Sequence, residues 1–186
     1  MNQKTKDPTS HFMVDLETMG TGPNAAIIAI GAVRFNIETG EILNTFYTPV
    51  LLESSMAMGG VVDAGTILWW LGQSDEARAE FTKPSKSIVT ALWEFRSFVQ
   101  LNNAIGKQDV KLWGNGATFD NVILAQAYKR AEIEPPWSHR GDRCYRTMRN
   151  ILPEVPDFEW DGVAHNALDD ARNQARYLVT ALKKSA

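Results

Sequence analysis

Hydrophobic and polar positions alternate within the first fifty residues, as they do in β-strands. Phe12–Glu17 places apolar side chains on one side and includes Asp15 and Glu17 on the other, which is the period of two of a strand. Ile27–Phe35 is almost entirely apolar and predicts a buried central strand. Glu41–Thr48 alternates well enough to form a third strand. Because the connections between them are short, the pattern favours an antiparallel meander.

Helical spacing follows after residue 65, interrupted by short apolar segments. Val110–Trp113 predicts a short strand, and Trp137–His139 is the candidate for another. Strands first, and then helices alternating with short strands, are typical of one α/β domain built on a mixed sheet. The expected helices are Thr66–Gly72, Asp75–Phe81, Ser87–Leu101, Ala117–Ala131, Arg143–Leu152 and a last long helix lined by Leu168, Ala171, Ala175, Leu178 and Leu182.

The composition is that of an ordinary globular domain. The chain has 186 residues, of which 44% are hydrophobic and 22% charged, so disorder and collagen-like repeats are excluded. A lone cysteine, Cys144, is expected to be a small packed residue, and it favours a reducing, intracellular setting. The longest nearly apolar run, Ala25–Val33, is far shorter than a membrane span, so no membrane partner is expected. Residues 1–10 are polar and predict a flexible leader before a single domain over 11–186.

Charge is unevenly distributed along the chain. The net charge is −3, yet residues 1–82 carry four basic and ten acidic side chains, whereas residues 83–186 carry fifteen and twelve. The segment Lys129–Arg149 holds six basic residues against three acidic ones. Such a stripe can bind phosphates even on an acidic protein. Taken alone, it is equally well explained as a solvated face.

Three acidic elements are candidates for chemistry, and each has a simpler explanation when considered alone. Asp15 and Glu17 project from the same face at the end of a strand, where a hard divalent cation would offset their burial; a pair of solvated acids on an edge strand is the alternative. Asp120 opens a helix after a strand and two glycines, where it could instead be a helix cap. His165 precedes the last helix, which carries Asp170, and the alternative for both is stabilisation of the helix start.

The order of these elements resembles the DEDDh 3′–5′ exonucleases, the DnaQ-like and RNase T-like family within the ribonuclease H-like superfamily. D-x-E-T matches at Asp15, Glu17 and Thr18, and the middle Asp at Asp120. H-x-A-x-x-D matches at His165, Ala167 and Asp170. The resemblance covers nearly the whole chain and implies an α/β, ribonuclease H-like fold: a five-stranded mixed sheet with an antiparallel meander and parallel strands, flanked by helices.

Some positions depart from the family pattern or suggest a branch of it. Met19 replaces the second threonine of D-x-E-T-T-G, and Gly116 stands where the family often has asparagine. Both departures concern the approach to substrate rather than to metal. Residues Thr66–Phe81 resemble a phage or prophage branch, which places the protein in the cytoplasm of a bacterial or phage-infected cell. Within this segment, we expect one of Trp69 and Trp70 to be core and the other to cover a surface or interface.

Carried over residue by residue, the resemblance implies a complete active site. Asp15, Glu17, Asp120 and Asp170 would bind two Mg²⁺ or Mn²⁺ ions, and His165 would be the general base. Thr18, Met19 and Gly20 would border the terminal nucleotide.

The implied activity is the release of nucleoside 5′-monophosphates from 3′ ends of single-stranded nucleic acid, with DNA slightly favoured over RNA. Alternatives are an exoribonuclease that trims RNA ends, a ribonuclease H-type endonuclease, a phosphodiesterase for very short oligonucleotides and a non-catalytic binding module. A homodimer, or a partner in replication or recombination, is also left open.

Overall fold

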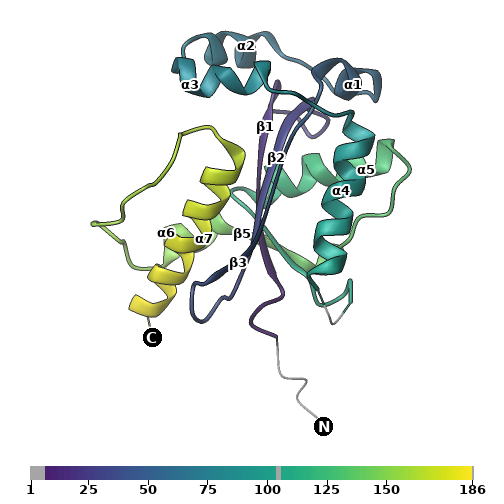
Figure 1. Cartoon of the computed structure of the whole chain (residues 1–186). Helices are drawn as coiled ribbons and strands as arrows, with labels where there is room; N and C mark the ends of the chain where they lie inside the picture. Colours follow the sequence, from purple (N-terminus) through teal and green to yellow (C-terminus); the bar gives the residue numbers. More distant parts are fainter. Residues whose placement is uncertain (1–6, 104–105, 186) are drawn as a thin grey trace.

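A mixed five-stranded sheet forms the centre of the protein, in a computed structural model that describes residues 7–103 and 106–185 (Figure 1). The strand order is β3-β2-β1-β4-β5. The first three strands are antiparallel, whereas β4 pairs in parallel with β1 and β5 in parallel with β4. The predicted meander with added parallel strands is therefore confirmed. The strands are β1 (His11–Thr18), β2 (Ile27–Phe35), β3 (Ile42–Pro49), β4 (Lys111–Gly114) and β5 (Asp142–Cys144).

Helices cover both faces of the sheet. On one face, α4 (Ile88–Leu101) and α5 (Val122–Arg130) pack against the side of β1 that carries Phe12, Val14 and Leu16. On the other face, α6 (Tyr145–Ile151) and the long α7 (Ala167–Lys184) form a second apolar cluster around Met13 and Val33 (Figure 1). Both faces of β1 are consequently buried, so its acidic side chains lie inside the protein.

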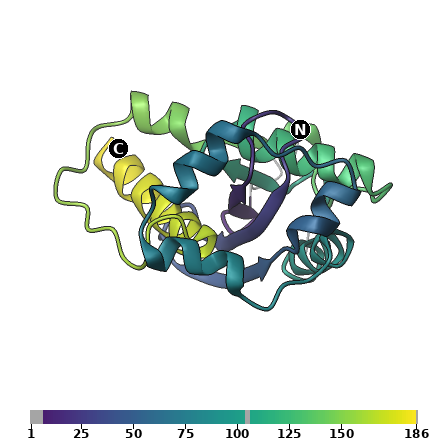
Figure 2. The same ribbon diagram turned by 90° about the horizontal axis from the view of Figure 1, so that it is seen from above.

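Three short helices form a cap over the carboxyl end of β1. They are α1 (Leu52–Ala57), α2 (Ala64–Leu71) and α3 (Asp75–Arg78), followed by the 3₁₀ turn η1 (Ala79–Thr82). Figure 1 places them beyond the ends of β1 and β2, and Figure 2 shows the same segment crossing over the sheet from above. Trp70 is buried beneath the cap, and its indole N–H donates to the carbonyl oxygen of Thr18 at 3.0 Å. This contact ties the cap to the end of β1.

Gly31 allows α7 to approach the sheet. It lies opposite Asp15 in the β1–β2 pairing. A Cβ at Gly31 would lie 2.1 Å from the backbone carbonyl carbon of Ala167, the first residue of α7. Ala167 itself is fully buried. The start of α7 therefore rests directly on β2, which brings the residues around it next to β1.

The structure differs from the sequence-based expectations at several element boundaries. The last strand is β5, so the candidate at Trp137–His139 is wrong; the Trp137 indole is buried and donates to Asp142 Oδ1 instead. The helix expected over 117–131 is divided into a π-helical turn, η2 (Ala117–Asn121), and α5. A short 3₁₀ turn, η3 (His139–Gly141), precedes β5, and α1 was not predicted.

Residues 7–10 of the expected leader are fixed to the sheet. Ser10 is buried, and the Arg34 guanidinium donates to the carbonyl oxygen of Thr9 at 2.9 Å. The backbone N–H of Ile37 donates to the carbonyl oxygen of Pro8. Residues 1–6 of that leader lie outside the described residues. Cys144 is half-buried, and no helix in the described ranges is long and apolar enough to cross a membrane.

Candidate active site

A cavity of about 790 Å³ lies at the carboxyl end of β1. Its walls come from β1, from the cap, from the junction between β4 and α5, from α6 and from the start of α7. All five residues predicted to do chemistry line this single cavity: Asp15, Glu17, Asp120, His165 and Asp170. Residues more than 150 positions apart in the chain therefore share one space.

Asp15 and Glu17 lie on a central strand rather than on an exposed edge. Their residues are 8% and 6% exposed, so the alternative of two solvated acids does not apply. The side-chain amide of Gln174 donates to Asp15 Oδ1 at 2.8 Å. Burial raises the pKa of Asp15 well above its usual range, and the nearby carboxylates of Asp120 and Asp170 raise it further.

Asp120 is held against β1 by backbone donors. The N–H of Leu16 donates to its Oδ1 at 3.2 Å and the N–H of Gly116 to its Oδ2 at 3.1 Å. A Cβ on Gly114 would lie 2.8 Å from the Cβ of Asp120, so only glycine leaves room for this approach. Burial raises the pKa of Asp120 to about 6, although these N–H groups oppose the shift. The Asp120 carboxylate thus binds the backbone of β1 and of the loop after β4, and it does not cap α5.

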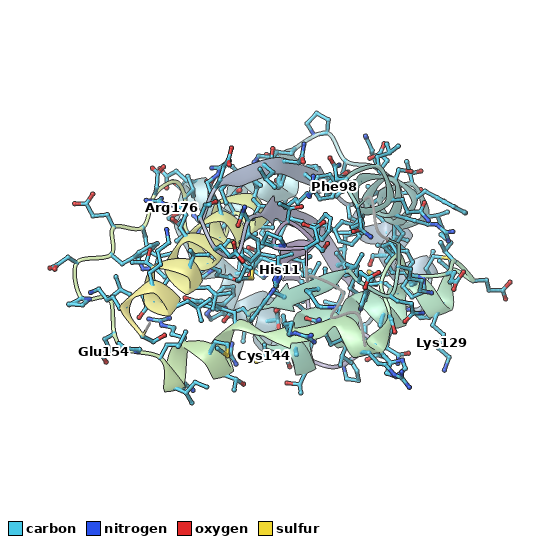
Figure 3. The ribbon with its side chains drawn as sticks, turned by 90° about the horizontal axis from the view of Figure 1, so that it is seen from below. His11, Phe98, Lys129, Cys144, Glu154 and Arg176 are labelled. Carbon is cyan, nitrogen blue, oxygen red and sulfur yellow. The ribbon has the colours of Figure 1, made fainter. Side chains whose placement is uncertain are left out.

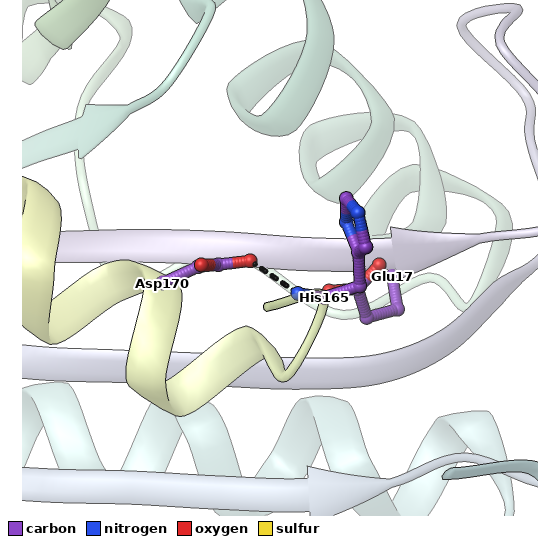
Figure 4. Close-up of side chains that lie close together, drawn as sticks. All are labelled: Glu17, His165 and Asp170. Atoms are coloured by element: carbon purple, nitrogen blue, oxygen red, sulfur yellow. Dashed lines mark hydrogen bonds between the residues drawn. The ribbon is translucent and has the colours of Figure 1, made fainter. Parts of the chain in front are cut away.

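His165 and Asp170 are joined at the start of α7. The backbone N–H of His165 donates to Asp170 Oδ2 at 3.0 Å (Figure 4). His165 has a positive φ of 64°, a conformation that few residues adopt outside turns. Asn166 supplies the helix cap, since its side-chain oxygen accepts from the N–H groups of Leu168 and Asp169. The capping role proposed as the alternative for His165 therefore belongs to its neighbour.

Asp169 fixes the loop that carries His165. Its Oδ2 accepts from the N–H of Val163 at 3.0 Å, and its Oδ1 forms an ion pair with Arg172. This carboxylate therefore faces the loop, whereas Asp170 faces β1. Burial raises the pKa of Asp170, opposed by its contacts with His165.

The donor set at the base of the cavity fits divalent cations. Glu17, His165 and Asp170 each offer a potential ligand atom, and these three atoms lie within 4.8 Å of one another (Figure 4). Asp15 and Asp120 are buried beside them in the same cavity. Carboxylate oxygens are the ligands that Mg²⁺ and Mn²⁺ prefer. Burial raises the pKa of Asp15, Asp120 and Asp170, as expected for carboxylates in a site that a bound cation would stabilise in their charged form.

The loop that follows β1 borders the cavity. Thr18 and Gly20 line the cavity, and the Thr18 hydroxyl donates to the carbonyl oxygen of Gly20 at 2.8 Å. Met19 is half-buried and packs against the apolar cluster of Ile28 and Trp70, whereas the cavity lining includes Thr18 and Gly20 on either side of it. That Met19 borders the terminal nucleotide stays a prediction.

The two adjacent tryptophans of α2 have different environments, as predicted. Trp70 is 2% exposed, whereas Trp69 is 46% exposed and lines the cavity. The Trp69 ring meets the imidazole of His165 edge to face, with centroids 4.9 Å apart. Trp69 therefore limits the positions that the imidazole can take.

Other cavity residues were not singled out from the sequence. Gln174 could have been found, because it follows Asp170 by one helical turn on the same face of α7. Arg146 and Arg149 also line the cavity and belong to the basic stretch Lys129–Arg149 already considered for phosphate binding, whereas Trp160 lines it from a segment whose position depends on tertiary packing. Periodicity alone gives no signal for such residues.

Comparisons with known proteins agree with this geometry. Residues 10–182 match the family described as the 3′–5′ exoribonuclease Rv2179c-like domain. An exodeoxyribonuclease of Enterobacteria phage T4 is 28% identical over 202 aligned positions, which cover 92% of this chain and 88% of the phage protein.

Two crystal structures share the fold at low sequence identity. The nuclease domain of 3′hExo, a DEDDh family member bound to rAMP, superposes with a TM-score of 0.63 at 19% identity and covers 94% of this chain and 92% of its own. The E. coli ExoI–ssDNA complex gives 0.59 at 18% identity over 91% of this chain and 40% of that one.

The buried carboxylates predict a contribution to the stability of the metal-free protein that grows as the pH falls from 7 to 5, whereas partly buried His11, whose pKa is lowered to about 4, contributes in the opposite direction. The pKa values of these acids are higher in the folded state than in the unfolded chain, so between about pH 4 and pH 7 their folded state holds more protons. The contribution of these acids therefore falls as the pH rises through this window. Urea unfolding in EDTA of parent and variants isolates it. The stability of Asp15→Asn relative to the parent should increase as the pH rises from 5 to 7, whereas that of Asp157→Asn, an exposed control, should not change with pH; a difference between Asp15→Asn and the parent that is independent of pH would contradict the assignment.

Proposed function

The chain belongs to the family of 3′–5′ exoribonuclease Rv2179c-like domains, and from that premise we propose that it releases nucleoside 5′-monophosphates from the 3′ ends of single-stranded nucleic acid, with DNA as the preferred substrate. Its activity class is that of a DEDDh-type 3′–5′ exonuclease. The observation that carries the proposal is the convergence of four acidic side chains and His165 in one cavity.

Asp15, Glu17, Asp120 and Asp170 are the proposed ligands of two divalent cations, Mg²⁺ or Mn²⁺. Family membership implies dependence on divalent metal, and the buried oxygen donors fit such ions. Bound in a site of this type, the ions lower the pKa of a water molecule and neutralise charge on the leaving oxygen. The protein contributes the fixed positions: Gln174 orients Asp15, and the N–H groups of Leu16 and Gly116 orient Asp120.

His165 is the proposed general base. Its backbone N–H is held by Asp170, and its ring faces the edge of Trp69, so the imidazole is confined at the wall of the cavity. There it takes a proton from the water whose oxygen attacks the phosphorus atom. The bond between phosphorus and the 3′ oxygen breaks, and that oxygen takes up a proton. The products are a nucleoside 5′-monophosphate and a strand shortened by one nucleotide with a new 3′ hydroxyl.

Thr18 and Gly20 are proposed to border the terminal nucleotide. The hydrogen bond from the Thr18 hydroxyl fixes this loop, and Trp70 anchors it through the Thr18 carbonyl oxygen. Met19, in the same loop, is proposed to border the same nucleotide while its side chain packs against Ile28 and Trp70. A preformed loop reduces the entropy that binding must overcome.

Two findings point to different sugars. The phage T4 relative is an exodeoxyribonuclease, which supports DNA as the substrate. The family description names an exoribonuclease, which supports the trimming of RNA ends as the second candidate. Both candidates use the same proposed ligands and base, and they differ only in contacts to the 2′ hydroxyl.

A digestion experiment tests the proposal directly. With Mg²⁺ or Mn²⁺, 5′-labelled single-stranded DNA should shorten in steps of one nucleotide, whereas EDTA or a blocked 3′ end should prevent shortening. Matched RNA and double-stranded substrates rank the preferences. Internal cleavage of a 3′-blocked strand would indicate an endonuclease, and intact strands under all conditions would contradict the proposal.

Replacement of His165 should separate chemistry from metal binding. We expect His165→Ala to lower kcat by about 100-fold or more, because a positioned base typically contributes that much. The rise in melting temperature on addition of Mn²⁺ should largely persist. His139→Ala is the matched control, since His139 is exposed and remote from the cavity lining. An unchanged kcat in His165→Ala would contradict its role as base.

A further inference from the structure

One wall of the catalytic cavity is basic. Arg146 and Arg149, both exposed, line the cavity from successive turns of α6. Within residues 7–103 and 106–185, no ion pair joins either guanidinium to a carboxylate. Neither charge is neutralised by a carboxylate of these described ranges, in contrast to Arg172, which is paired with Asp169, and the Arg149 guanidinium lies over the Tyr177 ring, 5.3 Å from its centroid.

A buried hydroxyl lies next to these arginines. Tyr145 is 1% exposed and lines the same cavity, and its hydroxyl oxygen has no hydrogen-bond partner among the described residues. Burial raises the pKa of Tyr145 to about 12, with the Arg149 charge acting in the opposite direction, so the hydroxyl keeps its proton at neutral pH. Leaving such a group unpaired is unfavourable, because no hydrogen bond replaces the one that it makes with water in the unfolded chain. A ligand oxygen is the kind of partner that would satisfy it.

The two ends of the cavity suit different parts of a nucleic-acid strand. The Thr18–Gly20 loop and Trp69 enclose the side under the cap, where the terminal nucleotide is proposed to bind. The acidic cluster is where the reacting phosphate is proposed to bind. Asn115, Phe119 and Trp160 also line the cavity, but its arginines come from α6, and each further nucleotide brings one more negative phosphate, which favours the α6 wall as the path of the strand.

We propose that Arg146, Arg149 and the Tyr145 hydroxyl form a subsite for the second phosphate from the 3′ end, the one on the 5′ side of the penultimate nucleotide. This inference rests on the proposed function and adds a rule for substrate length. A dinucleotide has only the reacting phosphate, whereas a trinucleotide also supplies the phosphate that occupies the subsite. By binding this phosphate, the α6 residues also orient the substrate strand, with its 5′ part toward α6.

Substrates of defined length test this subsite. For the parent, kcat/KM should rise by about tenfold or more from a dinucleotide to a trinucleotide, since hydrogen bonds to charged groups are worth about 1.5–3 kcal/mol. Arg146→Gln and Arg149→Gln should each lose most of this gain through a higher KM for the trinucleotide, so that the ratio of kcat/KM between trinucleotide and dinucleotide falls toward one. Lys129→Gln is the charge-matched control. Lys129 belongs to the same basic stretch, but it is exposed near the end of α5, and Figure 3 shows it on the other side of the molecule from Glu154.

Replacing one charged phosphate of the substrate by a neutral group tests which phosphate occupies the subsite. A neutral methylphosphonate at the second linkage of the trinucleotide should slow the parent, and the Arg146→Gln variant should then show no further loss. The slope of log kcat/KM against log salt should also become shallower in the arginine variants, because fewer phosphate contacts are made. Equal losses by a variant on the methylphosphonate and on the normal substrate would overturn the subsite.

Tyr145→Phe provides a test that separates binding from folding. Removal of an unpaired buried hydroxyl should leave the melting temperature unchanged or higher, whereas KM for the trinucleotide should rise. A purely structural tyrosine would move neither KM nor its dependence on length.

The failures of the two proposals are distinguishable. A parent that cleaves neither substrate contradicts the proposed function, and the subsite with it. A parent that cleaves both, with arginine variants that retain the length dependence or that lose equally on the dinucleotide and the trinucleotide, contradicts the subsite alone.

Discussion

The burial of several carboxylates in one place is the constraint on which the carboxyl end of β1 depends. Asp15 and Asp120 are almost fully buried, and Asp170 is partly so. Their hydrogen-bond donors are the Gln174 amide and the backbone N–H groups of Leu16, Gly116 and His165, all of them neutral. Neutral donors position these groups without cancelling their charge, which is why burial still raises all three pKa values. Divalent cations would supply the missing positive charge.

Small residues allow the segments that carry these carboxylates to approach one another. Gly31 lets the first residue of α7 rest on β2, and Gly114 lets the π-helical turn bring Asp120 against β1. Ala167, the central residue of H-x-A-x-x-D, is fully buried in the first of these contacts. The alanine of the motif is therefore needed for packing, while its histidine and aspartate are the candidates for chemistry. A larger side chain at any of these three small positions would push an acidic group away from the others.

Much of this arrangement was predictable from the sequence, for identifiable reasons. The period of two in β1 placed Asp15 and Glu17 on one face, and the spacing between His165 and Asp170 placed both at the start of α7. What could not be predicted depended on contacts between distant segments. The three residues of β5 are too few for a periodic signal, and the division of 117–130 into η2 and α5 follows from the fit of Asp120 against β1. For the basic stretch that includes α6, the sequence left phosphate binding and a solvated face as alternatives, because the neighbours of Arg146 and Arg149 depend on the tertiary structure.

Stoichiometric metal binding is the most direct measure of whether the carboxylates act together. Calorimetric titration of the metal-free protein with Mn²⁺ near pH 7.5 should show two ions bound per chain. Asp15→Asn and Asp120→Asn should each weaken or remove binding, while Asp157→Asn should match the parent. Absence of saturable binding, or titration curves that are unchanged when Asp15 and Asp120 are replaced, would contradict a shared metal centre at the end of β1.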